Sequence, residues 1–258
     1  MKKTSSVSQK LSTVLYLLLS IAVGFVVWIL ISTVFGLGNI IVPPNEVYHA
    51  LVKTLNDGSL WLNVRDSLIR VLGGFALGIV VSIPVAFLIG WYATFRNIVE
   101  PWIQFLRTIP PIALIPLVIA AFGIGTEAKV ILIFFAVFLV MVVTIYQGVV
   151  NVDQTLIKAA RVFDANNFQI FSHVVIPAAF PYILVGVRLG LAVSLTTLVA
   201  AELIGASTGI GHMIQQAAMY FNMDVVLLGI IVIGIIGFLF DKVILFAERK
   251  LTSWQEEG

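Results

Sequence analysis

The sequence predicts an all-α membrane protein with six transmembrane helices, and three observations lead to this class. Hydrophobic residues make up 60% of the 258 residues and charged residues only 11%, whereas a soluble domain carries about 25% charged residues. The mean hydropathy is +1.09, which is more apolar surface than a soluble core of this size can bury. Six segments are apolar over the roughly 20 residues that a helix needs to cross a bilayer.

The six expected spans are separated by two long loops and three shorter connections. In chain order, the spans cover residues 11–35, 67–91, 98–122, 128–150, 182–203 and 225–246. The third span is expected to be broken, because Pro110, Pro111 and Pro116 each remove a helix hydrogen-bond donor. Residues 36–66 form the first long loop, with a short amphipathic helix from Glu46 to Leu55.

The first span follows Lys2, Lys3 and Lys10 and therefore has two interpretations. A signal peptide would have an apolar region of about 7–15 residues followed by a small-x-small cleavage site. Here the apolar run is about 25 residues long and no such site follows. We therefore expect a retained helix.

The placement of Lys and Arg predicts the orientation, because cytoplasmic loops are enriched in them. With residues 1–10 and 247–258 inside, nine basic residues lie inside and four outside. The nine are Lys2, Lys3, Lys10, Arg96, Lys158, Arg161, Lys242, Arg249 and Lys250, and the four are Lys53, Arg65, Arg70 and Lys129. Both termini and loop 151–181 are thus expected in the cytoplasm, with loops 36–66 and 204–224 in the periplasm.

Several classes of function are excluded by missing motifs. The sequence has no phosphate-binding Gly-x-x-x-x-Gly-Lys-Ser/Thr loop, no His-Glu-x-x-His and no Gly-x-Ser-x-Gly. There is no cysteine, the three histidines are scattered, and a net charge of +2 does not favour nucleic acid. We expect no catalytic residue, no metal site and no cofactor in this chain, which leaves a conduit, a carrier or a membrane anchor.

Loop 151–181 carries two short amphipathic segments. In Thr155–Asp164, apolar and alanine side chains recur at three- and four-residue spacing, and Asp153 is a natural N-cap. A second apolar set follows Asn167 and ends where Pro177 is expected to stop the helix. The apolar face fits either a loop that seeks the membrane surface or a docking site for a partner, and its breadth favours the partner.

Polar residues within the spans are candidates for a translocation path. Arg107 could offer a planar donor fork to an oxyanion, or it could satisfy groups that the proline break frees. Glu202 could gate the path, pair with an arginine, or only end its helix. Serine and threonine side chains also serve as helix–helix contacts. The complete set of path candidates is Arg107, Thr108, Pro110, Pro111, Ser194, Thr197 and Glu202.

Two pairs of glycines are spaced four residues apart, at Gly74–Gly78 and Gly186–Gly190. Small residues at this spacing allow helix backbones to approach closely. The pairs therefore predict tight helix packing rather than a functional site.

The loop resembles the "EAA" loop of permease subunits of binding-protein-dependent ABC importers, which reads Glu-Ala-Ala, three residues, Gly, nine residues, Ile-x-Leu-Pro. The matching positions here are Lys158–Ala160, Asp164 and Val174–Pro177, with the same spacing. Lys158 replaces the glutamate and reverses a charge that would face the ATPase. Asp164 replaces the glycine, and aspartate tolerates positive φ better than most residues.

The resemblance extends over nearly the whole chain, to the sulfonate, taurine and nitrate permease family. It is carried by Ser67–Phe75, Arg107–Pro111, Phe122–Gly125, Gly186–Arg188 and Leu198–Ile204. Leu198–Ile204 with Gly209–Gln215 is most similar to the taurine-type branch.

The resemblance implies a type I ABC importer permease with a MetI-like fold in the bacterial cytoplasmic membrane. It implies a second copy of this chain, two ATPases that bind ATP and Mg, and an external substrate-binding protein. The residues that it assigns to ATPase coupling are Lys158, Ala159, Ala160, Phe163, Asp164, Phe168 and Pro177. The expected cargo is a sulfonate such as taurine. Nitrate, bicarbonate, aromatic or pyrimidine-type substrates remain alternatives, as does an ATP-independent transporter or channel.

Overall fold

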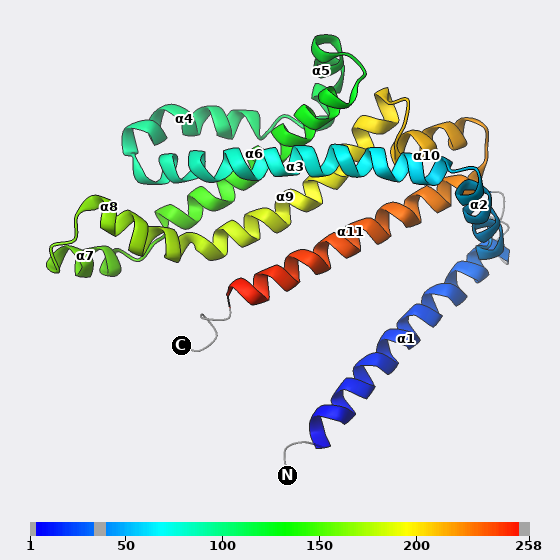
Figure 1. Cartoon of the computed structure of the whole chain (residues 1–258), viewed down its shortest axis with the longest axis horizontal. Coiled ribbons are helices and arrows are strands. Elements are labelled where there is room, and N and C mark those ends of the chain that lie inside the picture. Colours follow the sequence, from blue (N-terminus) through cyan, green and yellow to red (C-terminus); the bar gives the residue numbers. More distant parts are fainter. Residues whose placement is uncertain (1–3, 34–39, 253–258) are drawn as a thin grey trace. The chain divides into compact units, whose positions relative to one another are not determined.

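The computed structural model describes residues 4–33 and 40–252, and these residues form helices and no strand (Figure 1). The all-α class is thus confirmed. The helices are α1 (Thr4–Thr33), α2 (Pro44–Asn56), α3 (Ser59–Trp91), α4 (Ala93–Leu106), η1 (Pro111–Leu114), α5 (Ile115–Phe122), α6 (Thr126–Val150), α7 (Gln154–Val162), α8 (Asn167–Ile170), η2 (Phe171–Val175), α9 (Ile176–Gly205), α10 (Ile210–Met219) and α11 (Met223–Leu251).

The chain divides into two units by its internal packing. The first unit holds the residues up to Leu60 and Ile214–Ile230, and the second holds Trp61–Met213 and the residues from Ile231 onward. In the first unit, the Trp28 indole Nε1–H donates to the carbonyl of Val42 at 3.0 Å. The second unit contains every site residue that the sequence predicts.

Five described helical segments are long and apolar enough to cross a bilayer: Leu15–Thr33, Ser59–Trp91, Thr126–Val150, Asn167–Gly205 and Met223–Leu251. A bent pair, α4 with η1–α5, turns by 86° at its break and makes six if it counts as one span. The expected count of six spans is therefore consistent with the described helices, while residues 34 and 35 of the first expected span lie outside the described part of the chain. The break covers residues 107–110 and ends where η1 begins at Pro111, so that it lies at the first two of the three prolines that predict it.

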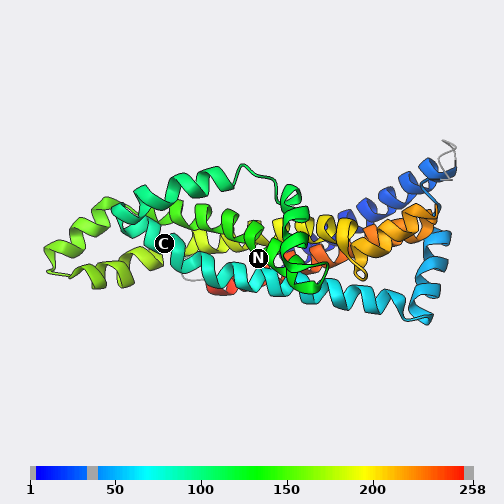
Figure 2. The ribbon, with the colours of Figure 1, turned by 90° about the horizontal axis from the view of Figure 1, so that it is seen from above.

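Helix α6 is the centre of the second unit and packs between α3 and α9. Its buried face repeats every four residues at Ile133, Val137, Met141 and Ile145, all of which belong to one apolar cluster. Figure 2 shows α6 and α9 running along each other for most of their length.

The predicted close packing at the glycine pairs is confirmed. A Cβ added to Gly74 would lie 2.6 Å from the Ile133 Cβ, and one added to Gly78 would overlap Val137. On α9, a Cβ at Gly190 would lie 3.1 Å from the Met141 Cγ. Both outer helices thus present small residues to α6, which lets the three backbones approach closely.

Helix α3 begins at Ser59, eight residues before the predicted start of the second span at Ser67. The backbone N–H of Ser59 donates to Asp57 Oδ1 at 2.9 Å, which provides a cap at this earlier position. The prediction followed apolarity alone and therefore missed the first eight residues of the helix, about two turns, in which polar and apolar residues are mixed. The short helix expected from Glu46 to Leu55 is confirmed as α2.

Candidate functional site

Helix α7, Gln154–Val162, carries the first half of the EAA-like loop and is capped at both ends. The Thr155 N–H donates to Asp153 Oδ1 at 2.8 Å, which confirms the predicted N-cap. This backbone hydrogen bond lowers the pKa of the Asp153 carboxyl, because it stabilises the charged form. The cap fixes the residue at which α7 begins.

The C-terminus of α7 ends in a left-handed residue at Asp164, whose φ is 56°. The Ala165 N–H donates to the Ala160 carbonyl at 3.1 Å, and the Asp164 N–H donates to the Arg161 carbonyl at 3.0 Å. This pair of bonds is the Schellman motif, which normally places glycine at the left-handed position. The aspartate that replaces the motif's glycine therefore adopts the conformation that the glycine would supply.

Replacing Asp164 with valine is expected to weaken this cap, since a β-branched side chain at positive φ is a steric outlier. The expected cost is about 1–2 kcal/mol, or about 5- to 30-fold faster opening of the two capping amides. Hydrogen exchange at Asp164 and Ala165 measures it. Asp164→Gly serves as the matched control and should exchange no faster than the parent; equal rates in the valine variant would contradict the strain.

Helix α8, Asn167–Ile170, begins with reciprocal side-chain bonds. The Gln169 N–H donates to Asn166 Oδ1 at 2.9 Å and the Asn166 N–H donates to Gln169 Oε1 at 2.8 Å. This capping box satisfies two backbone donors at the start of the helix. The turn between α7 and α8 is thus held from both sides.

Pro177 does not stop the chain, and here the sequence prediction is wrong. Helix α8 continues through the π-helical turn η2 into α9, so that the helix is unbroken from Asn167 to Gly205. Pro177 lies in the first turn of α9, where a missing N–H costs little and the preceding π turn has shifted the hydrogen-bond register. The fifth span therefore extends into the loop and connects it rigidly to the membrane helix.

The loop is anchored by one face and exposes the other. Ile170 and Val175 are buried in the cluster around α6, and the Phe171 ring meets Phe87 and Trp91 edge-on, with centroids 5.7 and 5.2 Å apart. By contrast, the side chains of Phe163 and Phe168 are 85% and 75% exposed. Figures 1 and 2 show α7 and α8 protruding beyond the end of α3.

The other predicted coupling residues divide between these two faces. Lys158, Ala159 and Pro177 are exposed, whereas Ala160 is half-buried against the apolar cluster. The two alanines of the motif therefore have different surroundings. A bulky side chain at Ala160 would press on the cluster, while one at Ala159 would alter only the outer surface.

A polar cluster surrounds Glu202, at the end of the second unit opposite the α7–α8 loop. The Arg70 guanidinium Nη1 donates to Glu202 Oε1 at 2.7 Å, and the two side chains are 5% and 0% exposed. Ser67 Oγ donates to the same carboxylate at 2.8 Å. The structure thus supports the pairing interpretation of Glu202, and its arginine partner is Arg70.

The same cluster holds the segment that follows α9. The Gly211 N–H donates to Glu202 Oε2 at 2.9 Å, and the Arg70 Nη1 donates to the Thr208 carbonyl at 2.6 Å. Gly209 has a φ of 117°, and a Cβ there would overlap the Glu202 carboxylate. Glycine is required at this position on both counts.

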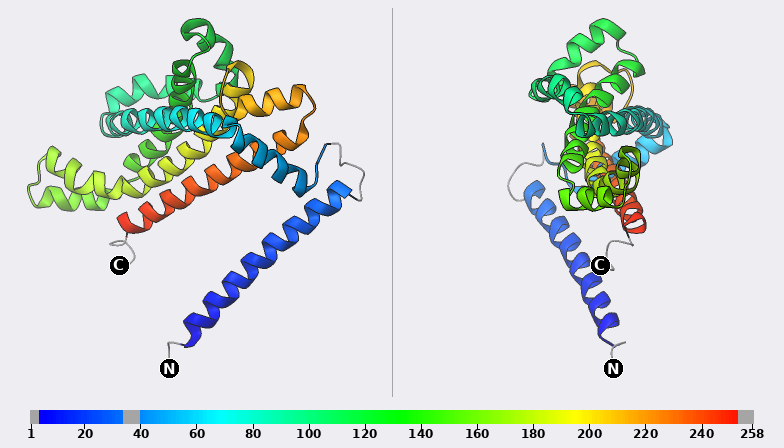
Figure 3. Two further views of the ribbon diagram at one scale, coloured as in Figure 1. Left: turned by 45° about the vertical axis from the view of Figure 1, so that its right-hand side comes forward. Right: turned by 90° about the vertical axis from the view of Figure 1, so that its left-hand side faces the viewer.

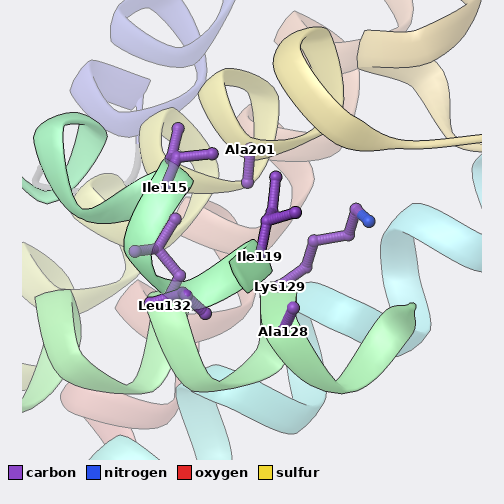
Figure 4. Close-up of a pocket in the computed structure, with 7 residues that line it drawn as sticks. Ile115, Ile119, Ala128, Lys129, Leu132 and Ala201 are labelled. Carbon is purple, nitrogen blue, oxygen red and sulfur yellow. The ribbon is translucent and has the colours of Figure 1, made fainter. Parts of the chain in front are cut away.

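Lys129 closes the helix end beside this cluster. Its Nζ donates to the carbonyls of Gly205 at 2.6 Å and Gly125 at 3.1 Å, and to that of Ile124. Lys129 and Leu132 also line a hollow of about 10 Å³, which is the size of one water molecule. Figure 4 shows the Lys129 nitrogen directed away from Leu132. The ammonium thus caps the C-terminus of α9 at Gly205.

The remaining path candidates lie in two further places. Arg107 is exposed at the end of α4 and donates to Gln104 Oε1 at 3.1 Å, with Thr108, Pro110 and Pro111 at the adjoining bend. Ser194 and Thr197 are buried on the α9 face that packs into the unit. The structure does not bring the seven candidates together, and their role in a path stays a prediction.

Comparison with known proteins identifies the family. A family model described as "Binding-protein-dependent transport system inner membrane component" matches residues 74–253. The chain belongs to this family. A protein of Brucella abortus described as a probable ABC transporter permease is 47% identical over 242 residues, covering 93% of this chain and 96% of that protein.

Two further relatives and one solved structure agree with this assignment. The taurine transport system permease protein TauC of Escherichia coli is 37% identical over 92% of this chain and 89% of its own. The nitrate import permease protein NrtB of Synechocystis is 31% identical over the same shares. An inward-facing structure of the MetNI methionine ABC transporter covers 74% of this chain and 93% of its own, with a TM-score of 0.63 at 21% identity, which confirms the expected MetI-like fold.

This permease is therefore the non-catalytic inner-membrane subunit of an ABC importer, and its family works with a separate ATPase and a substrate-binding protein. Membership of this family argues against the alternative of an ATP-independent transporter or channel.

Sequence reasoning missed the residues that complete the polar clusters of the permease. Arg70 and Lys129 were counted as periplasmic charges, but both are buried. The signal was available, since Arg70 and Glu202 are charges within apolar segments and such charges require partners. Asp241 is likewise a charge within an apolar span, and its carboxylate accepts a hydrogen bond from Arg188 Nε–H at 3.0 Å.

Proposed function

We propose that this permease imports a small anion of the sulfonate type, with taurine as the favoured cargo, by ATP-driven alternating access. The similarity to the taurine permease TauC over most of both chains supports the cargo class. The observation that carries the mechanism is the loop α7–α8, which is capped, anchored and yet exposes two phenylalanine side chains.

The exposed side chains of Phe163 and Phe168 form the surface that we assign to the ATPase. Each phenylalanine can bury 150–250 Å² in a contact. Phe168 stands on the helix that runs without a break from Asn167 to Gly205, and Phe163 lies before it, at the C-terminal end of α7. Movement of the ATPase would therefore pass along one helix to the membrane span. Two copies of the permease, two ATPases and one external binding protein form the proposed assembly.

The orientation that we propose has both termini and the α7–α8 loop in the cytoplasm. Of the four basic residues counted as periplasmic, only Lys53 and Arg65 are exposed in the structure, because Arg70 and Lys129 are buried with partners. Among the described residues, exposed basic side chains are still in excess on the side proposed as cytoplasmic, at Lys158, Arg161, Lys242, Arg249 and Lys250. Arg249 and Lys250 lie in the last turn of α11 on that side.

Nitrate is the second candidate cargo, because NrtB is also similar over most of the chain. Bicarbonate, aromatic acids and pyrimidine-type compounds are further candidate cargoes, and their uptake can be measured in the same way as that of taurine and nitrate. None of these changes the proposed assembly, since the binding protein delivers the cargo.

Uptake into proteoliposomes that contain the permease, its ATPase and its binding protein tests the proposal. We expect labelled taurine to accumulate only with ATP on the ATPase side, and nitrate to accumulate more slowly. A hydrolysis-deficient ATPase is the control. Accumulation of nitrate without taurine would overturn the cargo, and taurine uptake without ATP would overturn the mechanism.

A further inference from the structure

A hollow of about 620 Å³ lies between α9 and α11 and is lined mainly by apolar side chains. Three charged residues also line it: Arg188 from α9, and Asp241 and Glu248 from α11. Figure 3 shows α9 and the second half of α11 alongside each other. The hollow is large enough for a small organic molecule, since ligand sites measure about 300–1,000 Å³.

The ion pair in this hollow differs from the one at Glu202. Arg188 and Asp241 are joined at 3.0 Å, yet their side chains are 50% and 35% exposed. The Arg70–Glu202 pair is instead closed, at 5% and 0%. A guanidinium has five N–H donors, of which the bond to Asp241 uses one. An ion pair that is open to a hollow within an apolar span fits a polar pathway, because charges at membrane depth face protein or water.

A second hollow continues along the same face of α9. It measures about 430 Å³ and is lined by Thr196 and apolar residues up to Ile204, and it shares Leu195 with the first hollow. Together the two hollows follow α9 from Val185 to Ile204. Twenty residues at 1.5 Å each span about 30 Å, which is the thickness of the hydrocarbon core. The ion pair is the charged position on this continuous face.

We propose that the hollow at Arg188 and Asp241 is a transient binding site for a small zwitterion on its way through the membrane. The anionic oxygens of the cargo take the place of the Asp241 carboxylate on the Arg188 guanidinium, whose planar fork matches an oxyanion. The released Asp241 and the nearby Glu248 then face the ammonium of the cargo. An anion without an ammonium group would be repelled by these two carboxylates and would offer them no positive charge in return. This site rests on the proposed import function and narrows its cargo from small anions in general to zwitterions such as taurine, whose anionic sulfonate is accompanied by an ammonium group.

Single-cysteine labelling tests the site, because the chain contains no cysteine of its own. Ala192→Cys places a thiol in the charged hollow, and Ala200→Cys places one in the apolar hollow as the matched control. The permease–ATPase complex in liposomes is treated with an anionic sulfonatoethyl or a cationic trimethylammonioethyl methanethiosulfonate, and the mass of this chain reports the rate.

Adding Arg188→Gln to Ala192→Cys is expected to lower the ratio of anionic to cationic labelling about tenfold, the effect of one unit charge near the thiol. At Ala200→Cys the ratio should change less than about twofold. The double variant Arg188→Gln/Asp241→Asn removes both charges of the ion pair and serves if the single variant folds poorly. In this double variant, cargo should protect the Ala192→Cys thiol from labelling less than it does in the parent. An unchanged ratio at Ala192→Cys would overturn the site.

Protection by cargo decides the chemical class. Taurine is expected to slow labelling of Ala192→Cys at a lower concentration than ethanesulfonate, which lacks the amine, or ethylammonium, which lacks the sulfonate. Equal protection by ethanesulfonate would overturn the zwitterion, and no protection by any of the three would overturn the binding site. Labelling is read on this chain without transport, so a failure of ATP-driven uptake would count against the proposed function alone.

Discussion

Replacing Glu202 with alanine is expected to destabilise the permease by about 3–5 kcal/mol, because Arg70 would remain buried without its counter-charge. The substitution also removes the acceptor for Ser67 and for the Gly211 N–H, which leaves further buried donors unpaired. The loss of stability is measured by thermal unfolding of the purified protein in detergent. The fraction that still elutes as a single species in size-exclusion chromatography after heating reports how much protein remains folded. The segment after α9 should become the first part to exchange its amide hydrogens.

Two variants control this prediction. Arg65 and Asp66 form an ion pair of similar length, 3.0 Å, but Arg65 is 57% exposed, so Arg65→Ala should cost less than about 1 kcal/mol. The double variant Arg70→Met/Glu202→Leu removes both charges and should recover much of the loss, since a buried pair is often replaced by apolar residues at little cost. If Glu202→Ala were as stable as Arg65→Ala, the cluster would not hold the unit together.

Truncating Phe163 and Phe168 together is expected to abolish coupling while leaving the fold intact. Both side chains are largely exposed, so the free permease loses little packing. In the complex, each anchor of this kind contributes at least about 2 kcal/mol, which is about 30-fold in affinity. Co-purification of the ATPase and ATP-driven uptake should both fall by at least that factor in Phe163→Ala/Phe168→Ala.

Matched substitutions separate docking from folding. Phe122→Ala alters another exposed phenylalanine, at the end of α5 on the predicted periplasmic side, and should leave ATPase retention unchanged. Ile170→Ala empties a buried anchor of the loop and should lower both stability and retention. Because Ala160 packs inward and Ala159 is exposed, Ala159→Trp tests the outer surface without strain on the core. Retention at the parental level in the double phenylalanine variant would refute the assigned surface.

The fold class and the caps of the α7–α8 loop were predictable from the sequence, whereas the continuation of the helix through Pro177 was not. Composition and apolar length identify a helical membrane protein because lipid leaves a chain few other options. Caps are also local: Asp153 accepts from Thr155 two residues away, and the EAA-like pattern indicates that residue 164 has a positive φ. In both cases the deciding interaction lies within one turn of the residue concerned.

The partners of charged residues were decided only by the tertiary structure. Arg70 and Glu202 are 132 positions apart, and Arg188 and Asp241 are 53 apart, so no local pattern shows that they meet. The face of α9 that is open could not be predicted either, because the helix is apolar nearly all round and its Ser194 and Thr196 differ only by their position about the axis. Sequence thus determined that this chain is a helical membrane permease with a capped α7–α8 loop, since those properties depend on composition and on neighbours in the chain. Which charges are closed into the core and which are open to a hollow depends on how α3, α6, α9 and α11 pack, and only the folded structure specifies that.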